Sequence, residues 1–222
     1  MKQIYLQKQP TNKQLILLFA GWGMDENLLA PLTNLPDFDC CICYDYTDLS
    51  FDYTQLSQYS SIKLYAWSMG VWVAATTLQG KNLPIVRSLA INGTHYPIDL
   101  KLGIAPNIFK VTLNNISPTG MQNFYQRICG NNQQLLAIFN QHTTKRSIES
   151  LYSELAAIER HYLTNCAVNF AWQAAIIGKN DRIFFPAQQI AAWQGTTQLL
   201  TADHHYLDLN ALIENDRQTK SC

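Results

Sequence analysis

A serine lies at the junction of two very different runs in the segment LYAWSMGVWVAA, residues 64–75. The run SIKLYAW before Ser68 is typical of a buried strand, and SMGVWVAATTLQG after it has helical spacing and a helix-stopping glycine at Gly80. So sharp a turn from strand to helix would lift the hydroxyl above the carboxyl edge of a sheet and direct the first amides of the helix toward it. Residues 66–70 match the Gly-x-Ser-x-Gly nucleophile pattern with alanine in the first position, which alone is a weak signal.

Apolar runs alternate with helical segments on both sides of this junction. The other runs typical of strands are QLILLFAGWG, CCICYDY, IVRSLAING, AAIIGKNDRIF and TTQLLTADHH, and a last helix extends to about Glu214. Alternation of this kind favours parallel strands with helices covering both faces of the sheet. The expected fold class is therefore α/β, with a mostly parallel, twisted sheet flanked by helices.

The segment 94–165 differs from the rest because it has little strand signal. SPTGMQNFYQRI opens with Ser-Pro, an N-cap followed by proline at the first helical position, and SIESLYSELAAIERHY also begins at a serine. Each places its apolar residues on one helical face. We therefore expect residues 1–93 and 166–222 to form the sheet core, and residues 94–165 to form a helical insertion.

Composition restricts the classes of partner. The 222 residues have a formal net charge of zero, 47% hydrophobic residues and 14% charged residues. One domain with ample core material is expected, and non-specific nucleic-acid binding is disfavoured because it needs clustered positive charge. The polar start MKQIYLQKQPTNKQ does not resemble a secretory signal, and no apolar run approaches the ~18 to 20 residues that span a bilayer. We expect a cytoplasmic protein without a membrane partner.

The six cysteines are interpreted as small buried hydrophobic residues in a reducing compartment. Three of them, Cys40, Cys41 and Cys43, crowd one predicted strand, where alternation puts Cys41 and Cys43 on one face and Cys40 on the other. A zinc site would need ligand pairs at another spacing. The remaining three are Cys129, Cys166 and Cys222. We expect no metal and no organic cofactor.

A serine nucleophile needs a base to take its proton and an acid to orient that base. In hydrolases with a strand–serine–helix turn on an α/β sheet, the acid and then the histidine follow in loops after the last strands. Asp181 follows the strand AAIIG, and His204 and His205 follow the last strand. Asp181 as a simple turn residue or helix cap is the alternative, and the choice between the two histidines stays open.

The loop FAGWGMD, residues 19–25, follows an early strand and is a candidate oxyanion hole. Gly21 and Gly23 allow a sharp turn, so the backbone amide of Trp22 can point inward. The second donor would be the amide of Met69, next to the nucleophile. The alternative interpretation is a glycine-rich turn without a chemical role.

These segments together resemble the BioG-type pimeloyl-acyl-carrier-protein methyl ester esterases, a compact branch of the α/β-hydrolases. The resemblance rests on LLFAGWGMDENLL, CYDYTDLSFD, AWSMGVWVA, AINGTHYPIDLKLGIAPNIF and FYQRICG. It implies an α/β-hydrolase with a helical lid at residues 94–165. The implied reaction is hydrolysis of the methyl ester of pimeloyl-[acyl-carrier protein], in biotin synthesis.

Carried over residue by residue, the resemblance implies Ser68 as nucleophile, Asp181 as orienting acid and a histidine of ADHHYLDL as base. His205 is favoured over His204 because family members show His-Tyr followed by an apolar residue. Asp208 departs from the family pattern, which has phenylalanine at that position. The implied oxyanion donors are the amides of Trp22 and Met69.

An acyl carrier protein is the implied partner. Such carriers are acidic around the serine that bears their prosthetic arm, so a receptor needs local positive charge. Arg127 and Arg160 are the first candidates because each lies on a predicted amphipathic helix beside its apolar stripe. Two other functions stay open: a thioesterase or short-chain carboxylesterase on the same fold, and a non-catalytic hydrolase relative that binds a ligand. The sequence predicts no oligomeric state.

Overall fold

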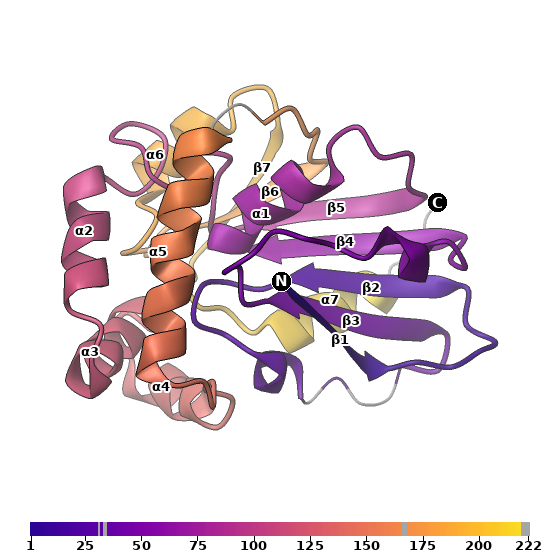
Figure 1. The fold of residues 1–222 in the computed structure, drawn as a ribbon, viewed down its shortest axis with the longest axis horizontal. Coiled ribbons are helices and arrows are strands. Elements are labelled where there is room, and N and C mark those ends of the chain that lie inside the picture. Colours follow the sequence, from indigo (N-terminus) through magenta and orange to yellow (C-terminus); the bar gives the residue numbers. More distant parts are fainter. Residues whose placement is uncertain (31, 33–34, 166–167, 219–222) are drawn as a thin grey trace.

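One twisted sheet forms the centre of the computed structural model, which describes residues 1–30, 32, 35–165 and 168–218. Within these residues the strand order is β1-β3-β2-β4-β5-β6-β7 (Figure 1). The strands are β1 (Lys2–Gln7), β2 (Gln14–Phe19), β3 (Phe38–Tyr44), β4 (Ser61–Trp67), β5 (Ile85–Ile91), β6 (Ala174–Gly178) and β7 (Thr197–Thr201). Neighbouring strands are parallel except β1, which pairs antiparallel with β3 at the edge. The predicted mostly parallel sheet is confirmed.

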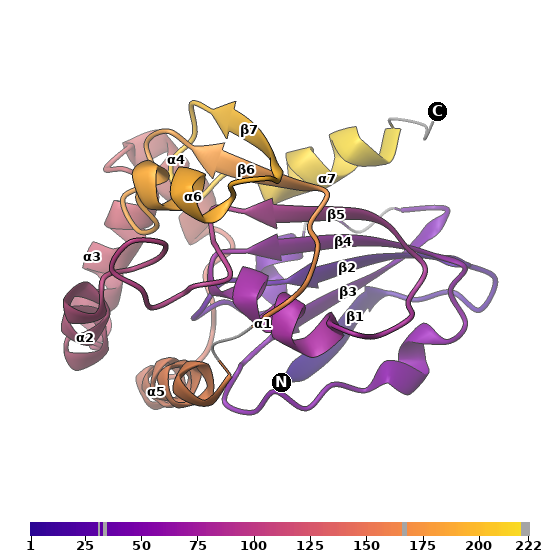
Figure 2. The same cartoon turned by 90° about the horizontal axis from the view of Figure 1, so that it is seen from above.

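Helices cover both faces of this sheet, as predicted. Figure 2 shows α1 (Met69–Leu78) on one face and α7 (Leu209–Gln218) on the other. Short 3-10 helices, η1 (Glu26–Leu29) and η2 (Tyr53–Leu56), and helix α6 (Pro186–Ala192) complete the layers. Along β2, Leu15 and Leu17 belong to the core cluster of one face, and Ile16 and Leu18 to that of the other. Because both faces are covered, the strand is apolar throughout instead of alternating.

The cysteines behave as the alternation predicts. Cys41 and Cys43 pack in one core cluster, and Cys40 and Cys129 pack in the other, all four as free, buried thiols. Burial raises the pKa of Cys40 and of Cys129 to about 12, so both stay protonated at neutral pH. Cys166 and Cys222 lie outside the described residues.

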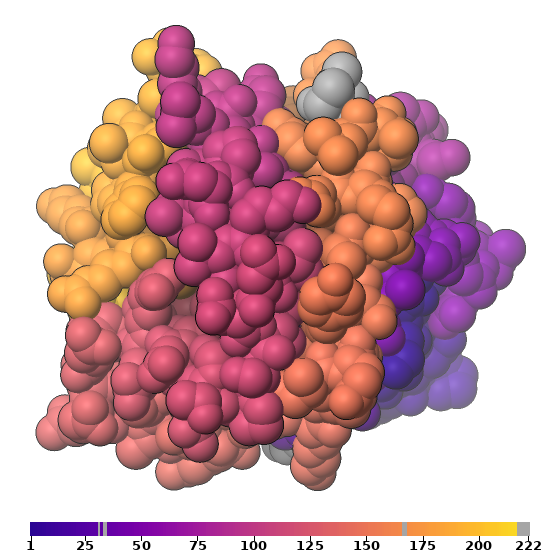
Figure 3. Space-filling view, turned by 60° about the vertical axis from the view of Figure 1, so that its left-hand side comes forward, coloured from indigo at the N-terminus to yellow at the C-terminus, as the bar shows by residue number. Residues whose placement is uncertain are grey.

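Four helices connect β5 to β6 within the segment predicted as an insertion. They are α2 (Pro106–Asn114), α3 (Pro118–Ile128), α4 (Gln133–Asn140) and α5 (Ile148–Thr164). They lie at the carboxyl end of the parallel strands, and Figure 3 shows how they cover that end of the molecule. Ser117 and Ser147 cap α3 and α5, since their hydroxyls accept from the amides of Gly120 at 3.0 Å and Ser150 at 3.2 Å.

No helix within the described ranges combines the length and the apolar character needed to cross a bilayer.

Candidate active site

The sharp turn between β4 and α1 exposes Ser68 at the end of its strand. Ser68 has φ 59° and ψ −127°, a backbone conformation that residues other than glycine rarely adopt. Two glycines make room for it. A Cβ on Gly70 would lie 2.3 Å from the carbonyl oxygen of Phe19, and a Cβ on Gly93 would lie 2.2 Å from the carbonyl oxygen of Ser68. The turn therefore depends on close backbone approaches that only glycine allows.

The structure brings three of the predicted residues into one hydrogen-bonded chain. Ser68 Oγ lies 2.9 Å from His205 Nε2, and His205 Nδ1 lies 3.1 and 3.0 Å from the two carboxylate oxygens of Asp181. All three are buried, with exposed fractions of 6% for Ser68, 1% for His205 and 2% for Asp181. With His205 neutral, Nδ1–H donates to Asp181 and Nε2 accepts from the Ser68 hydroxyl. This arrangement can remove a proton from Ser68.

His204, the alternative base, points elsewhere. Its Nδ1 lies 3.3 Å from the carbonyl oxygen of Asn180, and its ring packs so tightly on Gly130 that a Cβ there would come within 2.1 Å of it. The geometry therefore favours His205 over His204 as the base.

Asp181 is held by donors that the sequence did not indicate. Its Oδ1 accepts from the amides of Ile183 at 2.8 Å and Phe184 at 3.1 Å, and its Oδ2 accepts from Gln189 Nε2 at 2.9 Å. Gln189 is fully buried on α6. These bonds fix the plane of the carboxylate and hence the orientation of the imidazole. A glutamine in the mixed sequence PAQQIAA carries no signal that distinguishes it from a surface residue.

The histidine loop is fastened to the sheet by Asn92. Asn92 Nδ2 donates to the carbonyls of His204 at 2.8 Å and His205 at 2.9 Å, while its Oδ1 accepts from the amide of Gly178 at 2.7 Å. Trp67 Nε1 donates to the same His205 carbonyl at 2.9 Å. The loops after β5, β6 and β7 are thus joined at one point. In the sequence, Asn92 showed only as part of a strand-ending Asn-Gly pair.

The candidate oxyanion loop lies against the turn. A Cβ on Gly21 would come within 3.2 Å of Ser68 Cβ, so the loop after β2 passes directly beside the serine. Met69 is the first residue of α1, so its N–H has no partner within the helix. Among the described residues, neither this N–H nor that of Trp22 donates to another protein group. Two free amides beside Ser68 are what an oxyanion hole requires.

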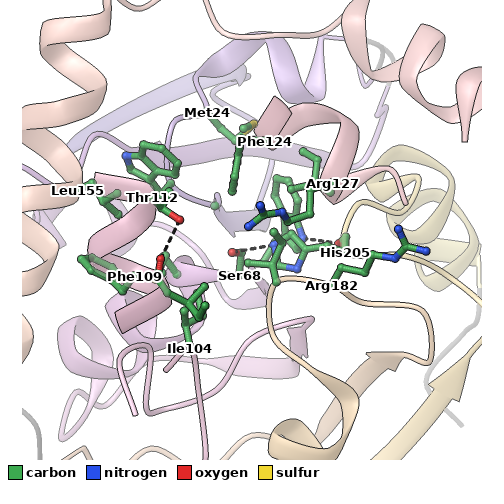
Figure 4. Close-up of a pocket in the computed structure, with 17 residues that line it drawn as sticks. Met24, Ser68, Ile104, Phe109, Thr112, Phe124, Arg127, Leu155, Arg182 and His205 are labelled. Carbon is green, nitrogen blue, oxygen red and sulfur yellow. Dashed lines mark hydrogen bonds between the residues drawn. The ribbon is translucent and has the colours of Figure 1, made fainter. Parts of the chain in front are cut away.

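A pocket opens above Ser68 and encloses about 560 Å³ of space, part of it open to solvent. Figure 4 shows Ser68 between an apolar side and a basic side. The apolar side is lined by Ile104, Phe109 and Leu155, and the basic side by Arg127, Arg182 and His205. A wider depression at the mouth is also lined by Arg127 and Arg182. The pocket can therefore hold an acyl chain on one side and an anionic group at its mouth.

Two exposed arginines differ in their position relative to the pocket. Arg182 is exposed at the pocket mouth directly after Asp181, and no motif in the sequence distinguishes it from other surface cations. Arg160, by contrast, is exposed on α5 and does not line this pocket or the depression at its mouth. Among the described residues no group of three or more His, Cys, Asp and Glu side chains is placed to hold a metal ion.

The sheet order and the serine at the sharp turn between β4 and α1 define the chain as an α/β-hydrolase, and solved structures share this fold. One is MGS-M2, an alpha/beta hydrolase enzyme from a Medee basin deep-sea metagenome library. It is 13% identical, with a TM-score of 0.61 over 100% of this chain and 95% of that one. At this identity the likeness shows the fold alone.

The chain belongs to the BioG family, because the family model described as pimeloyl-ACP methyl esterase BioG matches residues 1–214. The crystal structure of BioG from Haemophilus influenzae has a TM-score of 0.85 and 34% identity, over 94% of this chain and 95% of that one. A relative from Bacteroides fragilis (strain 638R), named malonyl-[acyl-carrier protein] O-methyltransferase, is 45% identical over 208 residues. That match covers 93% of this chain but 42% of the relative, so the chain spans less than half the length of that protein. The family resemblance seen in the sequence is confirmed.

Proposed function

We propose that this chain is a serine esterase that hydrolyses the methyl ester of pimeloyl-[acyl-carrier protein] to pimeloyl-[acyl-carrier protein] and methanol, in biotin synthesis. The main support is the chain of hydrogen bonds from Ser68 through His205 to Asp181, which lies at the base of an apolar pocket. Membership of the BioG family supports the choice of substrate.

The reaction follows from this geometry. His205 Nε2 takes the Ser68 proton while Oγ attacks the ester carbonyl, and the amides of Trp22 and Met69 stabilise the oxyanion. Asp181 stabilises the imidazolium that forms. The tetrahedral intermediate collapses, and methanol leaves with the proton from His205. Water, activated by the same histidine, then hydrolyses the acyl-enzyme and restores the Ser68 hydroxyl.

Residues 94–165 act in this proposal as a lid that selects the end of the acyl chain. The substrate carries a methyl ester at its distal end and a thioester at the carrier, and only the first must be cut. The apolar residues Ile104, Phe109 and Leu155 come from the lid segment and form one wall of the pocket. An acyl chain lying along this wall places its distal carbonyl at Ser68 and leaves the thioester outside.

The name of the B. fragilis relative also supports the substrate class. Its name states O-methyl transfer to malonyl-[acyl-carrier protein], and this chain matches 42% of its length. A methyltransferase that esterifies a carrier-bound carboxylate makes a methyl ester of the kind that the proposed esterase removes. Removal of the methyl group must therefore follow methylation in the same reaction sequence.

The carrier would dock where the basic residues meet the pocket mouth. Arg127 and Arg182 line that mouth, and neither guanidinium forms an ion pair with a carboxylate of the described residues. Unpaired cations at the mouth attract the acidic surface of a carrier and speed its encounter with the pocket. Arg160 remains part of the proposed docking surface, farther from the opening.

We expect Arg127→Glu to raise KM for carrier-bound substrate roughly 3- to 10-fold at low salt, because charge reversal at a rim opposes association. Arg160→Glu should raise it less. The ratio of kcat/KM for carrier-bound substrate to that for a short soluble methyl ester measures the effect. Lys13→Glu is the control, because it makes the same charge reversal just before β2, at the other end of the sheet.

For the wild-type protein the same ratio of kcat/KM values should fall as salt rises, because salt screens charges over ~8 to 10 Å. Equal slowing of both substrates by Arg127→Glu would place carrier docking elsewhere.

The non-catalytic alternative is separated from the esterase by covalent labelling. A fluorophosphonate reacts with an activated serine, so intact-mass analysis should show one label, on Ser68, and loss of ester hydrolysis in proportion. A protein that stays unlabelled while binding acylated carrier would be a binding module.

A further inference from the structure

The loop that carries Trp22 is bonded to the lid segment at four consecutive residues. The bonds are Trp22 Nε1 to the Leu151 carbonyl at 2.9 Å, the Gly23 amide to Glu154 Oε2 at 3.1 Å, Arg146 Nη1 to the Met24 carbonyl at 3.3 Å, and the Lys145 amide to Asp25 Oδ2 at 2.7 Å. The candidate oxyanion loop is therefore held by residues 120 to 131 positions away in the sequence.

Glu154 is the most buried charged group of this network. It lies on α5 with an exposed fraction of 0%. Its Oε2 accepts from the Gly23 amide, its Oε1 accepts from the Tyr46 amide at 3.0 Å, and Arg146 Nη1 donates to Oε2 at 2.6 Å. Arg146 also pairs with Asp45 Oδ1 at 3.1 Å. A buried carboxylate without such partners would be strongly destabilising. The hydrogen bonds and the ion pair with Arg146 therefore offset the cost of burying Glu154.

The charge balance has two opposing contributions. Burial is the larger contribution and leaves the pKa of Glu154 above its usual value, while Arg146 and the amides of Tyr46 and Gly23 act to lower it. The direct contacts of the carboxylate are all donors, which favour its ionised form.

We propose that Glu154 is a positioning residue for ester hydrolysis, because its bond to the Gly23 amide fixes the loop that presents the Trp22 amide to the oxyanion. The Trp22 and Gly23 amides belong to adjacent peptide groups. The Trp22 indole is bonded to the Leu151 carbonyl, and the peptide group that joins Trp22 to Gly23 is bonded to Glu154. Both the side chain of Trp22 and the backbone that follows it are therefore held in place. A preorganised donor stabilises the transition state more than a donor that must first be ordered. The inference rests on the proposed function and adds a residue to it.

A carboxylate suits this position better than its amide analogue. Both oxygens of Glu154 accept from different core loops, one after β2 and one after β3. Glutamine has one acceptor oxygen and one NH₂ donor, so Glu154→Gln would set a donor against the Gly23 amide, the Tyr46 amide or Arg146. The volume is nearly unchanged, so the substitution tests hydrogen bonding and not packing.

We expect Glu154→Gln to lower kcat for a short soluble methyl ester about 10- to 100-fold with KM nearly unchanged, somewhat less than the loss of a whole oxyanion donor. A boronic acid that adds to Ser68 Oγ as a tetrahedral adduct should bind more weakly by the same factor. The matched control is Glu159→Gln on the same helix, which removes a surface ion pair with Lys110 at 2.7 Å. It should keep kcat within about twofold, as exposed pairs contribute little.

Phosphonate titration gives the fraction of folded, reactive Ser68, and every rate is divided by it. If Glu154→Gln does not fold, Glu154→Asp decides, since the shorter carboxylate keeps its charge but retracts from the amides; its kcat should also fall with KM unchanged. A corrected kcat within threefold of wild type, a change in KM alone, or failure of both variants to fold would overturn the positioning role.

A wild-type protein that cleaves short esters but not the carrier-bound ester would refute the proposed substrate, and the comparison of Glu154→Gln with wild type on short esters would remain valid. A wild-type protein that cleaves no ester would refute both.

Discussion

Ser68→Ala is expected to lower kcat for ester hydrolysis by about 10⁴-fold or more, because the nucleophile is lost and only the pocket and the two amides remain. The fold should persist. The Ser68 hydroxyl bonds to His205 in the described structure, and alanine keeps the Cβ at the turn while it removes only the hydroxyl oxygen. Steady-state rates on a short methyl ester and on carrier-bound substrate, with a thermal unfolding curve for each protein, measure both expectations.

Background hydrolysis from contaminating enzyme limits this measurement, so the variant and wild type should be purified identically and titrated with phosphonate. The variant should take up no label. Turnover within tenfold of wild type, with the label absent, would remove Ser68 from the mechanism.

His205→Ala is expected to lower kcat by a comparable factor, whereas His204→Ala should stay within about tenfold of wild type. His205 Nε2 lies 2.9 Å from Ser68 Oγ, so its loss removes the base and the imidazole that Asp181 contacts. His204 contacts the Asn180 carbonyl and Gly130 and does not reach the serine. The two variants differ by one position in the same loop, so each is the control for the other.

Removal of the base should also change the pH dependence. The residual rate of His205→Ala should rise with pH as hydroxide replaces the imidazole, while His204→Ala should keep the wild-type profile. An inactive His204→Ala beside an active His205→Ala would assign the base to the preceding residue, against the geometry.

Local sequence signals predicted the core of this site because each depends on a few neighbouring residues. The turn at Ser68 shows as a strand, a serine and small residues, and the positions of Asp181 and of the pair His204 and His205 follow from strand ends, whereas only the family resemblance favoured His205. The helices α3 and α5 were found from their serine caps and apolar faces. Strand β1 was missed because KQIYLQ is a half-exposed edge strand that does not read as a buried run.

The supporting residues could not be predicted because their roles depend on contacts across the fold. Asn92 bonds to a residue 113 positions away, and Glu154 bonds to one 131 positions away. In the sequence, Glu154 reads as one more charge on an amphipathic helix, yet it is fully buried. Arg127 and Arg160 look equivalent on their helices, but only Arg127 lines the pocket. The apolar pattern of a helix indicates which of its faces is buried. Which loop or pocket that helix contacts depends on how the whole chain packs, and the pattern does not contain this information.

Under the proposed function the protein cuts the distal methyl ester and spares the thioester, and one substrate tests both bonds. Wild-type protein is incubated with the methyl ester of pimeloyl-[acyl-carrier protein], and the carrier is followed by intact-mass spectrometry while methanol is measured in the same sample. We expect the carrier to lose the mass of one methylene group, with one methanol released per carrier and the acyl thioester intact. Loss of the whole acyl group, or an unchanged carrier under conditions where Ser68 takes up phosphonate, would contradict the proposed function.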